Sequence, residues 1–207
     1  MLMTDREGTR TMPNALDGTA KDVLFYEGHT TSKFTDREVT DEQLQELYAL
    51  TCLSPTAVNS TPLRIVYVRS AEAKVRLLPL LAEGNRPKSE SASVAAILAA
   101  DVAFLDHLGR LAPFITDPAK VFPDQQSAEQ GAMFNAALQA GAFILAVRAL
   151  GLAAGPMNGI DTAGIDAEFL GDLPWRSFMV VNIGEAAADG TRPRGARLEF
   201  DEAVRVV

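Results

Sequence analysis

The stretch SAEQGAMFNAALQAGAFILAVRALG, residues 127–151, decides the fold, because it is the longest run in the chain with one consistent period. Its apolar side chains recur at helical spacing, and Gly151 stands where a helix commonly ends. Ser127 and Gln130 fit a capping box at its start. We expect so apolar and alanine-rich a helix to be buried on most sides, at the centre of a domain or at a subunit interface.

Helices and strands are mixed on both sides of this helix without a regular alternation, which favours an α+β fold over a doubly wound parallel sheet. One helix is expected to begin after Thr40, which forms a capping box with Gln43, and to end before Pro55. Other helices are expected at 20–27, from 71 with a break at Pro79, and at 162–170, and strands at 63–70, 93–101 and 176–184.

The composition describes an ordinary acidic globular domain, with 207 residues and a net charge of -8. Its basic residues are scattered, which argues against nucleic-acid binding. The single Cys52 and two histidines exclude an intrachain disulfide and a Cys/His zinc site. Because no run reaches the roughly 18 apolar residues of a membrane span, we expect a cytoplasmic protein. Residues 1–18 are predicted to be a flexible leader, and 19–207 a single domain with an extended C-terminal tail.

Five polar segments between these elements carry the candidate binding residues. EGHTTSKFT at 27–35 and TRPRGARLEF at 191–200 concentrate the donors that suit a phosphate. GLAAGPMNGID at 151–161 has glycines that would let a flat ligand approach the backbone, and EGNRPK at 83–88 adds an amide and an ammonium group. SPTAVNSTP at 54–62 is too polar for a plain connector beside an apolar core.

Each segment also has a plain interpretation, such as a solvated turn, a basic tail or an ordinary loop. However, no nucleophile stands beside a base and no nucleophile elbow is present. Polar segments without a reactive side chain indicate that a bound cofactor supplies the chemistry.

In this order the segments resemble motifs of the FMN-dependent nitroreductase family, over residues 22–205. HTTSKF looks like its N-terminal phosphate motif, SPTAVNSTP like its PSSxNxQP loop, and EGN like its flavin-ring contact. ALGLAAGPMNGID looks like the segment that passes flavin N5, and the arginine tail like the C-terminal phosphate clamp. LYAL, RALGL, GPMNGID and RLEFDEA resemble the malonic semialdehyde reductase (RutE-like) branch.

This resemblance implies a nitroreductase-like fold, with a central, mostly antiparallel sheet flanked by helices, in an intertwined homodimer that binds FMN at its interface. Thr31, Lys33, Arg194 and Arg197 would hold the phosphate, and Asn85 the pyrimidine edge of the ring. The 54–62 loop would reach the flavin held by the other subunit. The implied cofactor-binding residues are His29, Thr30, Thr31, Ser32, Lys33, Pro55, Thr56, Asn59, Asn85, Lys88, Pro156, Asn158, Gly159, Arg194 and Arg197.

Three residues depart from the family pattern. His29 stands where arginine is usual, which would make one phosphate contact dependent on pH. Thr61 replaces a common glutamine, and Asn158 stands where some members carry glutamate near N5.

The resemblance implies ping-pong hydride transfer from NADH or NADPH through flavin N5 to malonic semialdehyde, yielding 3-hydroxypropionate in pyrimidine degradation. Lys33 or Lys88 near N1 would stabilise the reduced ring. The alternatives are a broad quinone or nitroaromatic reductase, a flavin-binding protein without turnover, and a structural dimerisation module. The sequence identifies neither a proton donor nor a carboxylate anchor for the acceptor, and the 112–126 loop with Phe114 and Phe122 is the candidate lid.

Overall fold

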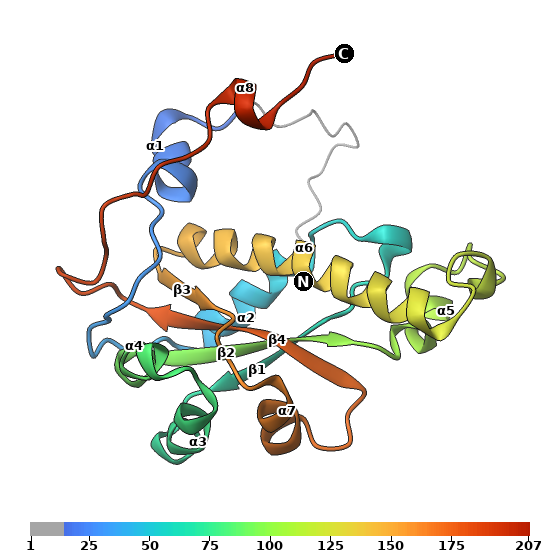
Figure 1. Cartoon of the computed structure of the whole chain (residues 1–207), viewed down its shortest axis with the longest axis horizontal. Coiled ribbons are helices and arrows are strands. Elements are labelled where there is room, and N and C mark those ends of the chain that lie inside the picture. The colour runs from blue at the N-terminus through green and yellow to red at the C-terminus, as the bar shows by residue number, and fades with distance from the viewer. Residues whose placement is uncertain (1–14) are drawn as a thin grey trace, which may run out of the picture.

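The computed structural model describes residues 15–207, so most of the leader expected at 1–18 lies outside the described residues. This part of the chain forms a four-stranded sheet in the order β1-β2-β4-β3, with every neighbouring pair antiparallel (Figure 1). The sheet and its flanking helices confirm the α+β prediction. The strands are β1 (Leu63–Val68), β2 (Val94–Asp101), β3 (Ala153–Met157) and β4 (Trp175–Gly184).

Strand β2 forms the centre of the domain, and every one of its residues is buried. Ala96 and Leu98 belong to the apolar cluster on the α6 face of the sheet, whereas Ala95 and Ile97 belong to the cluster on the opposite face. A strand covered by helices on both faces has no polar side, which explains its continuous apolar run.

Helix α6 (Gln125–Ala149) is the long helix that the sequence predicts, and it crosses one face of the sheet (Figure 1). The alanines Ala132, Ala136 and Ala140 are buried against the strands, together with Phe143. Their small side chains let the helix axis approach the sheet closely. By length and composition alone α6 is also apolar enough to span a membrane, contrary to the sequence expectation. One side of α6 is buried against the sheet, but only 44% of its most apolar window is buried within one chain, so the expected burial on most sides is not reached.

The start of α6 corrects the predicted capping box of Ser127 and Gln130. The cap is Asp124, whose carboxylate accepts the Ser127 N–H at 2.7 Å, while the Asp124 N–H donates to Ser127 Oγ at 3.2 Å. A carboxylate caps as well as a hydroxyl, so the helix begins earlier and Ser127 takes the reciprocal position.

The remaining helices follow their sequence signals closely. The capping box of Thr40 and Gln43 is present, and the predicted break at Pro79 is a tight turn that directly follows α3. The α2 helix lies with α6 on one side of the sheet, and α3 and α7 lie on the other (Figure 1). The helices are α1 (Gly18–Lys21), α2 (Asp41–Thr51), α3 (Ala71–Leu77), α4 (Arg86–Ser91), α5 (Leu108–Leu111), α7 (Thr162–Ile165) and α8 (Phe200–Ala203).

Strand β3 was not predicted from the sequence, because the 151–161 segment was interpreted as a turn, and the short helices α4 and α8 were not predicted either. β3 pairs with β4 and forms an edge of the sheet. Its fourth residue, Pro156, has no N–H to donate, which is tolerated where a strand has one neighbour. Its glycine and proline suggested a turn, although the segment is an edge strand. Three of the expected binding residues, Pro156, Asn158 and Gly159, lie in or just beyond it.

Candidate functional site

The first candidate site is a cavity of about 570 Å³ between the N-terminal segment, α4, the end of α6 and the C-terminal tail, here called the arginine cavity. It brings together six residues expected from the sequence: His29, Thr30, Ser32, Lys88, Arg194 and Arg197. Arg148 and Arg192 also line it, and among the described residues no acidic side chain does. A cationic lining of this kind in an acidic chain suits an anion.

Arg148 and Arg194 are fixed by backbone carbonyls. Arg194 Nη2 donates to the carbonyls of Phe25, Tyr26 and Gly28 at 3.1, 2.6 and 3.0 Å. Arg148 Nη1 donates to the carbonyl of Leu24 at 2.9 Å. Burial, and secondarily the charge of Arg194, lower the pKa of the Arg148 guanidinium. Two guanidiniums held close together without a carboxylate leave a net positive charge for a ligand to neutralise.

Gly28 permits this arrangement. A Cβ at this position would lie 2.5 Å from Nη1 of Arg148, so a larger residue would displace the guanidinium. The sequence analysis did not identify Arg148 or Arg192. The available signal for Arg148 was an isolated charge near the end of an otherwise apolar helix, and Arg192 belongs to a tail of which only Arg194 and Arg197 were selected.

Two of the expected phosphate contacts do not line the arginine cavity. The Thr31 N–H donates to Ala154 O at 3.0 Å, and its side chain is buried. Lys33 Nζ pairs with Asp189 at 2.6 Å on the surface. Successive side chains of an extended segment point to opposite sides, so Thr30 and Ser32 face the cavity while Thr31 and Lys33 turn away.

A second group of the expected binding residues adjoins the cavity at Lys88. Lys88 Nζ donates to Asn85 Oδ1 at 3.0 Å, and Asn85 Nδ2 donates to Gly159 O at 3.2 Å. A Cβ on Gly159 would lie 3.1 Å from Asn85 Nδ2, so glycine allows the two segments to approach. The structure thus joins Asn85, Lys88 and Gly159, with Pro156 and Asn158 in the chain segment that leads to them.

The 54–62 loop lies outside the arginine cavity, so Pro55, Thr56 and Asn59 are not joined to it within one chain. Helix α6 holds the loop: Asn135 Oδ1 accepts the Ala57 N–H at 2.7 Å. Val58 and Asn59 have φ of 50° and 54°. Positive φ is costly for β-branched valine, so surrounding bonds must maintain this shape.

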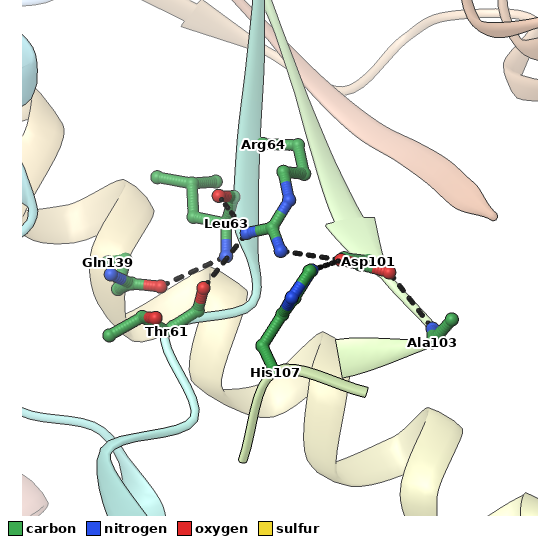
Figure 2. A network of polar contacts seen from close by, with 7 residues as sticks. All are labelled: Thr61, Leu63, Arg64, Asp101, Ala103, His107 and Gln139. Carbon is green, nitrogen blue, oxygen red and sulfur yellow. Dashed lines mark hydrogen bonds and ion pairs between the residues drawn. The ribbon is translucent and has the colours of Figure 1, made fainter. Parts of the chain in front are cut away.

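A second cavity of about 660 Å³ lies beside this loop and is named the tryptophan cavity after Trp175. Figure 2 shows the polar network at its edge. The side chain of Asp101 is only 3% exposed, and its Oδ2 lies 2.5 Å from Arg64 Nη2 and 3.4 Å from His107 Nε2. Arg64 Nη1 donates to the carbonyls of Thr61 and Leu63, both at 3.0 Å.

The sequence analysis missed the tryptophan cavity because no local motif marks it. Its lining comes from α2, the 54–62 loop, β1, α5, α6 and β4, which only the fold brings together. Within residues 15–207, no group of three or more His, Cys, Asp or Glu side chains is placed to hold a metal ion.

Comparison with known proteins gives one consistent family. The family model described as "Nitroreductase family" matches residues 28–185. A relative from Streptomyces griseus, provisionally named an NADH dehydrogenase/NAD(P)H nitroreductase, is 50% identical over 95% of this chain and 100% of its own length. A relative from Leptothrix cholodnii with the same provisional name is 45% identical, with the same coverage of both chains.

Solved structures agree on the fold. The Bacillus subtilis protein ydfN, provisionally named a nitroreductase, has a TM-score of 0.80 at 23% identity, covering 89% of this chain and 97% of its own. A protein of Exiguobacterium sibiricum, provisionally named a nitroreductase and solved in complex with FMN, has a TM-score of 0.78 at 19% identity. It covers 95% of this chain and 100% of its own.

Proposed function

Because the chain belongs to the nitroreductase family, we propose that it is an FMN-dependent NAD(P)H oxidoreductase. The observation that carries this proposal is the lining of the arginine cavity. Its arginines, Lys88 and His29 form no ion pair with any carboxylate in residues 15–207. A phosphate monoester supplies the dianion that this donor set lacks.

The residues present fit FMN in chemistry and in arrangement. Arg148, Arg194 and Arg197 with Thr30 and Ser32 would hold the phosphate, because they line one cavity as cations and hydroxyl donors. In this proposal Thr30 and Ser32 contact the phosphate in place of Thr31 and Lys33.

The ring of FMN would lie along the edge formed by Asn85, Lys88 and Gly159. When bound, the cofactor would accept hydride from NADH or NADPH at N5 and deliver it to an acceptor. Lys88 would place its positive charge near the electron-rich edge of the reduced ring, and the flat backbone around Gly159 would leave N5 accessible.

A homodimer would complete the site with the 54–62 loop of the second subunit. The outward side of α6 exposes Phe134 at 66% and Leu138 at 48%, and the tail exposes Leu198 and Phe200. Apolar side chains on this scale mark an interface more often than a free surface. In this assembly Pro55, Thr56 and Asn59 would contact the flavin bound by the partner subunit, in a cytoplasmic enzyme.

For the acceptor we propose malonic semialdehyde, reduced to 3-hydroxypropionate, on the basis of the branch motifs in the sequence. In that reaction hydride adds to the aldehyde carbon and a proton to its oxygen. A broad nitroaromatic or quinone reductase fits the cationic cavity and the names of the relatives equally well.

Flavin retention is the first test. Purified protein should retain the visible absorption of FMN after desalting, and it should bind riboflavin far more weakly, because riboflavin lacks the phosphate. Equal affinity for both would contradict the assignment of the arginine cavity. Anaerobic NADH should then bleach the bound flavin; a stable yellow protein would favour a flavin-binding protein without turnover.

The acceptor is tested separately, by comparing kcat/KM for malonic semialdehyde and for a quinone with the same FMN-loaded protein and NADH. Preference for the aldehyde supports the proposed substrate. Preference for the quinone leaves the flavin site intact and assigns the broader reductase.

A further inference from the structure

The tryptophan cavity has a cationic lining of its own. Arg64, His107 and Arg110 line it, and no aspartate or glutamate of residues 15–207 does. The buried carboxylate of Asp101 pairs with Arg64 (Figure 2). Arg110 is exposed and makes neither an ion pair nor a side-chain hydrogen bond with any residue that the structure describes. The cavity therefore retains at least one cation, in a chain whose net charge is -8.

Two neutral donors in the same cavity also lack acceptors. Gln139 is 3% exposed, and its Oε1 accepts the Leu63 N–H at 3.0 Å, while its Nε2 has no bond to a described residue. The Tyr67 hydroxyl is buried without a partner in residues 15–207. Burial raises the pKa of Tyr67 to about 12, so this hydroxyl remains a donor at neutral pH. A buried donor without a partner, such as the Tyr67 hydroxyl, is costly unless a ligand or water satisfies it, whereas Gln139 Nε2 is not among the buried unpaired atoms and is an accessible donor.

Aromatic and aliphatic side chains line the rest of the cavity together with polar ones. Trp175 lies beside Arg64, whose guanidinium carbon is 6.0 Å from the ring centroid, and Tyr48 and Ile65 also line the cavity. A volume of about 660 Å³ is within the range of small-molecule sites. The lining thus matches a small organic acid, with a carboxylate at the cationic end and a short carbon body against the rings.

We propose that the tryptophan cavity binds the carboxylate of the electron acceptor, with Arg110 as its main charge partner and His107 and Gln139 as further donors. The substrate class is a short oxo acid or another carboxylate-bearing acceptor. The 54–62 loop, expected to face the partner's flavin, contributes Asn59 and Thr61 to the lining. The inference therefore rests on the proposed function, and it supplies the carboxylate anchor that the sequence did not identify.

The network beneath the cavity fixes this arrangement. Asp101 holds Arg64 at 2.5 Å and lies 3.4 Å from His107 Nε2, so one buried carboxylate contacts both a guanidinium and an imidazole. Because Arg64 is already paired, Arg110 is the guanidinium left for a ligand.

Trp175 is the only tryptophan in the chain, so its fluorescence reports directly on this cavity. The FMN-loaded protein is titrated with benzoate and with benzamide, which has the same shape and no charge. Benzoate should produce a saturable change at about tenfold lower concentration than benzamide. Arg110→Gln should remove this difference. The control Arg37→Gln, an exposed arginine paired with Glu185 elsewhere, should retain it.

A kinetic comparison tests whether the ligand is the acceptor. Arg110→Gln should lower kcat/KM for 4-nitrobenzoate by about tenfold more than for 4-nitrobenzamide. Equal losses, or no benzoate signal from Trp175, would overturn the inference while retained FMN leaves the proposed function standing. Failure to bind FMN would instead refute the proposed function, so flavin retention after desalting distinguishes the two failures.

Discussion

The two cavities hold their arginines in different ways. In the arginine cavity, backbone carbonyls orient Arg194 and Arg148, and neither guanidinium meets a carboxylate in residues 15–207. In the tryptophan cavity, Arg64 is held by the buried carboxylate of Asp101. A carbonyl orients a guanidinium and leaves its positive charge unpaired, whereas a carboxylate neutralises that charge. The first arrangement prepares a cation for a ligand, and the second makes it part of the fold.

The largest expected effect comes from breaking the buried pair. Asp101→Asn leaves Arg64, whose side chain is 21% exposed, without its counter-charge and weakens its hold on the loop carbonyls. We expect the free energy of unfolding to fall by about 3 kcal/mol. Reversible urea denaturation measures this value.

The double variant Asp101→Asn with Arg64→Gln is the matched control, since it removes both charges. It should be more stable than Asp101→Asn alone, and equal stability would show that the pair is not coupled.

Removing a carbonyl-held arginine should affect the ligand more than the fold. Arg194→Gln is expected to raise the Kd for FMN by about 30-fold, because one charge-assisted phosphate contact is worth about 2 kcal/mol. Fluorescence titration with FMN measures it, and riboflavin serves as the ligand control. An equal loss for riboflavin would mean that Arg194 acts only by holding the turn at Phe25–Gly28.

A smaller effect is expected at the unpartnered hydroxyl of Tyr67. Its pKa is about 12 in the folded chain against 10.0 for the free side chain, so the native state favours the protonated form. The corresponding stability is present below pH 10 and is lost as pH rises toward 12, because the unfolded chain releases the proton first. After discounting for partial exposure, we expect wild type to lose about 2 kcal/mol more than Tyr67→Phe over this interval.

The measurement is urea denaturation of both proteins at several pH values between 9 and 12. Parallel pH profiles for wild type and Tyr67→Phe would show that this hydroxyl titrates normally and is not held in an apolar site.

The contrast between the cavities also explains what could be predicted from sequence. The arginine cavity is built from short segments whose donors are neighbours in the chain, so local patterns identified His29, Lys88 and the tail. The sequence did not show which alternate side chains of the 29–33 segment face the cavity, because that depends on how the extended segment pairs with its neighbours. The tryptophan cavity joins residues from six segments far apart in the sequence, and no local spacing predicts that they lie together.

The fold shows the same limit. Strong periodicity and caps located α2, α6, β1, β2 and β4, whereas β3 was missed because an edge strand tolerates the glycine and proline that suggest a turn. The cap of α6 was misplaced because Asp124 and Ser127 both satisfy the local rule, and only geometry decides between them.

The smallest effect on stability is expected at Lys33. Its ion pair with Asp189 lies on the surface, unlike the arginines of the two cavities. Lys33 and Asp189 are 57% and 70% exposed, and the hydrogen bond from Lys33 lowers the pKa of Asp189. Water screens such pairs, so Lys33→Gln should leave the unfolding midpoint unchanged. Since Lys33 also lies outside the arginine cavity, FMN affinity should change far less than in Arg194→Gln. A loss as large as that of Arg194→Gln would mean that Lys33 leaves Asp189 for the cofactor, and that the phosphate contact first expected from the sequence forms only when FMN is bound.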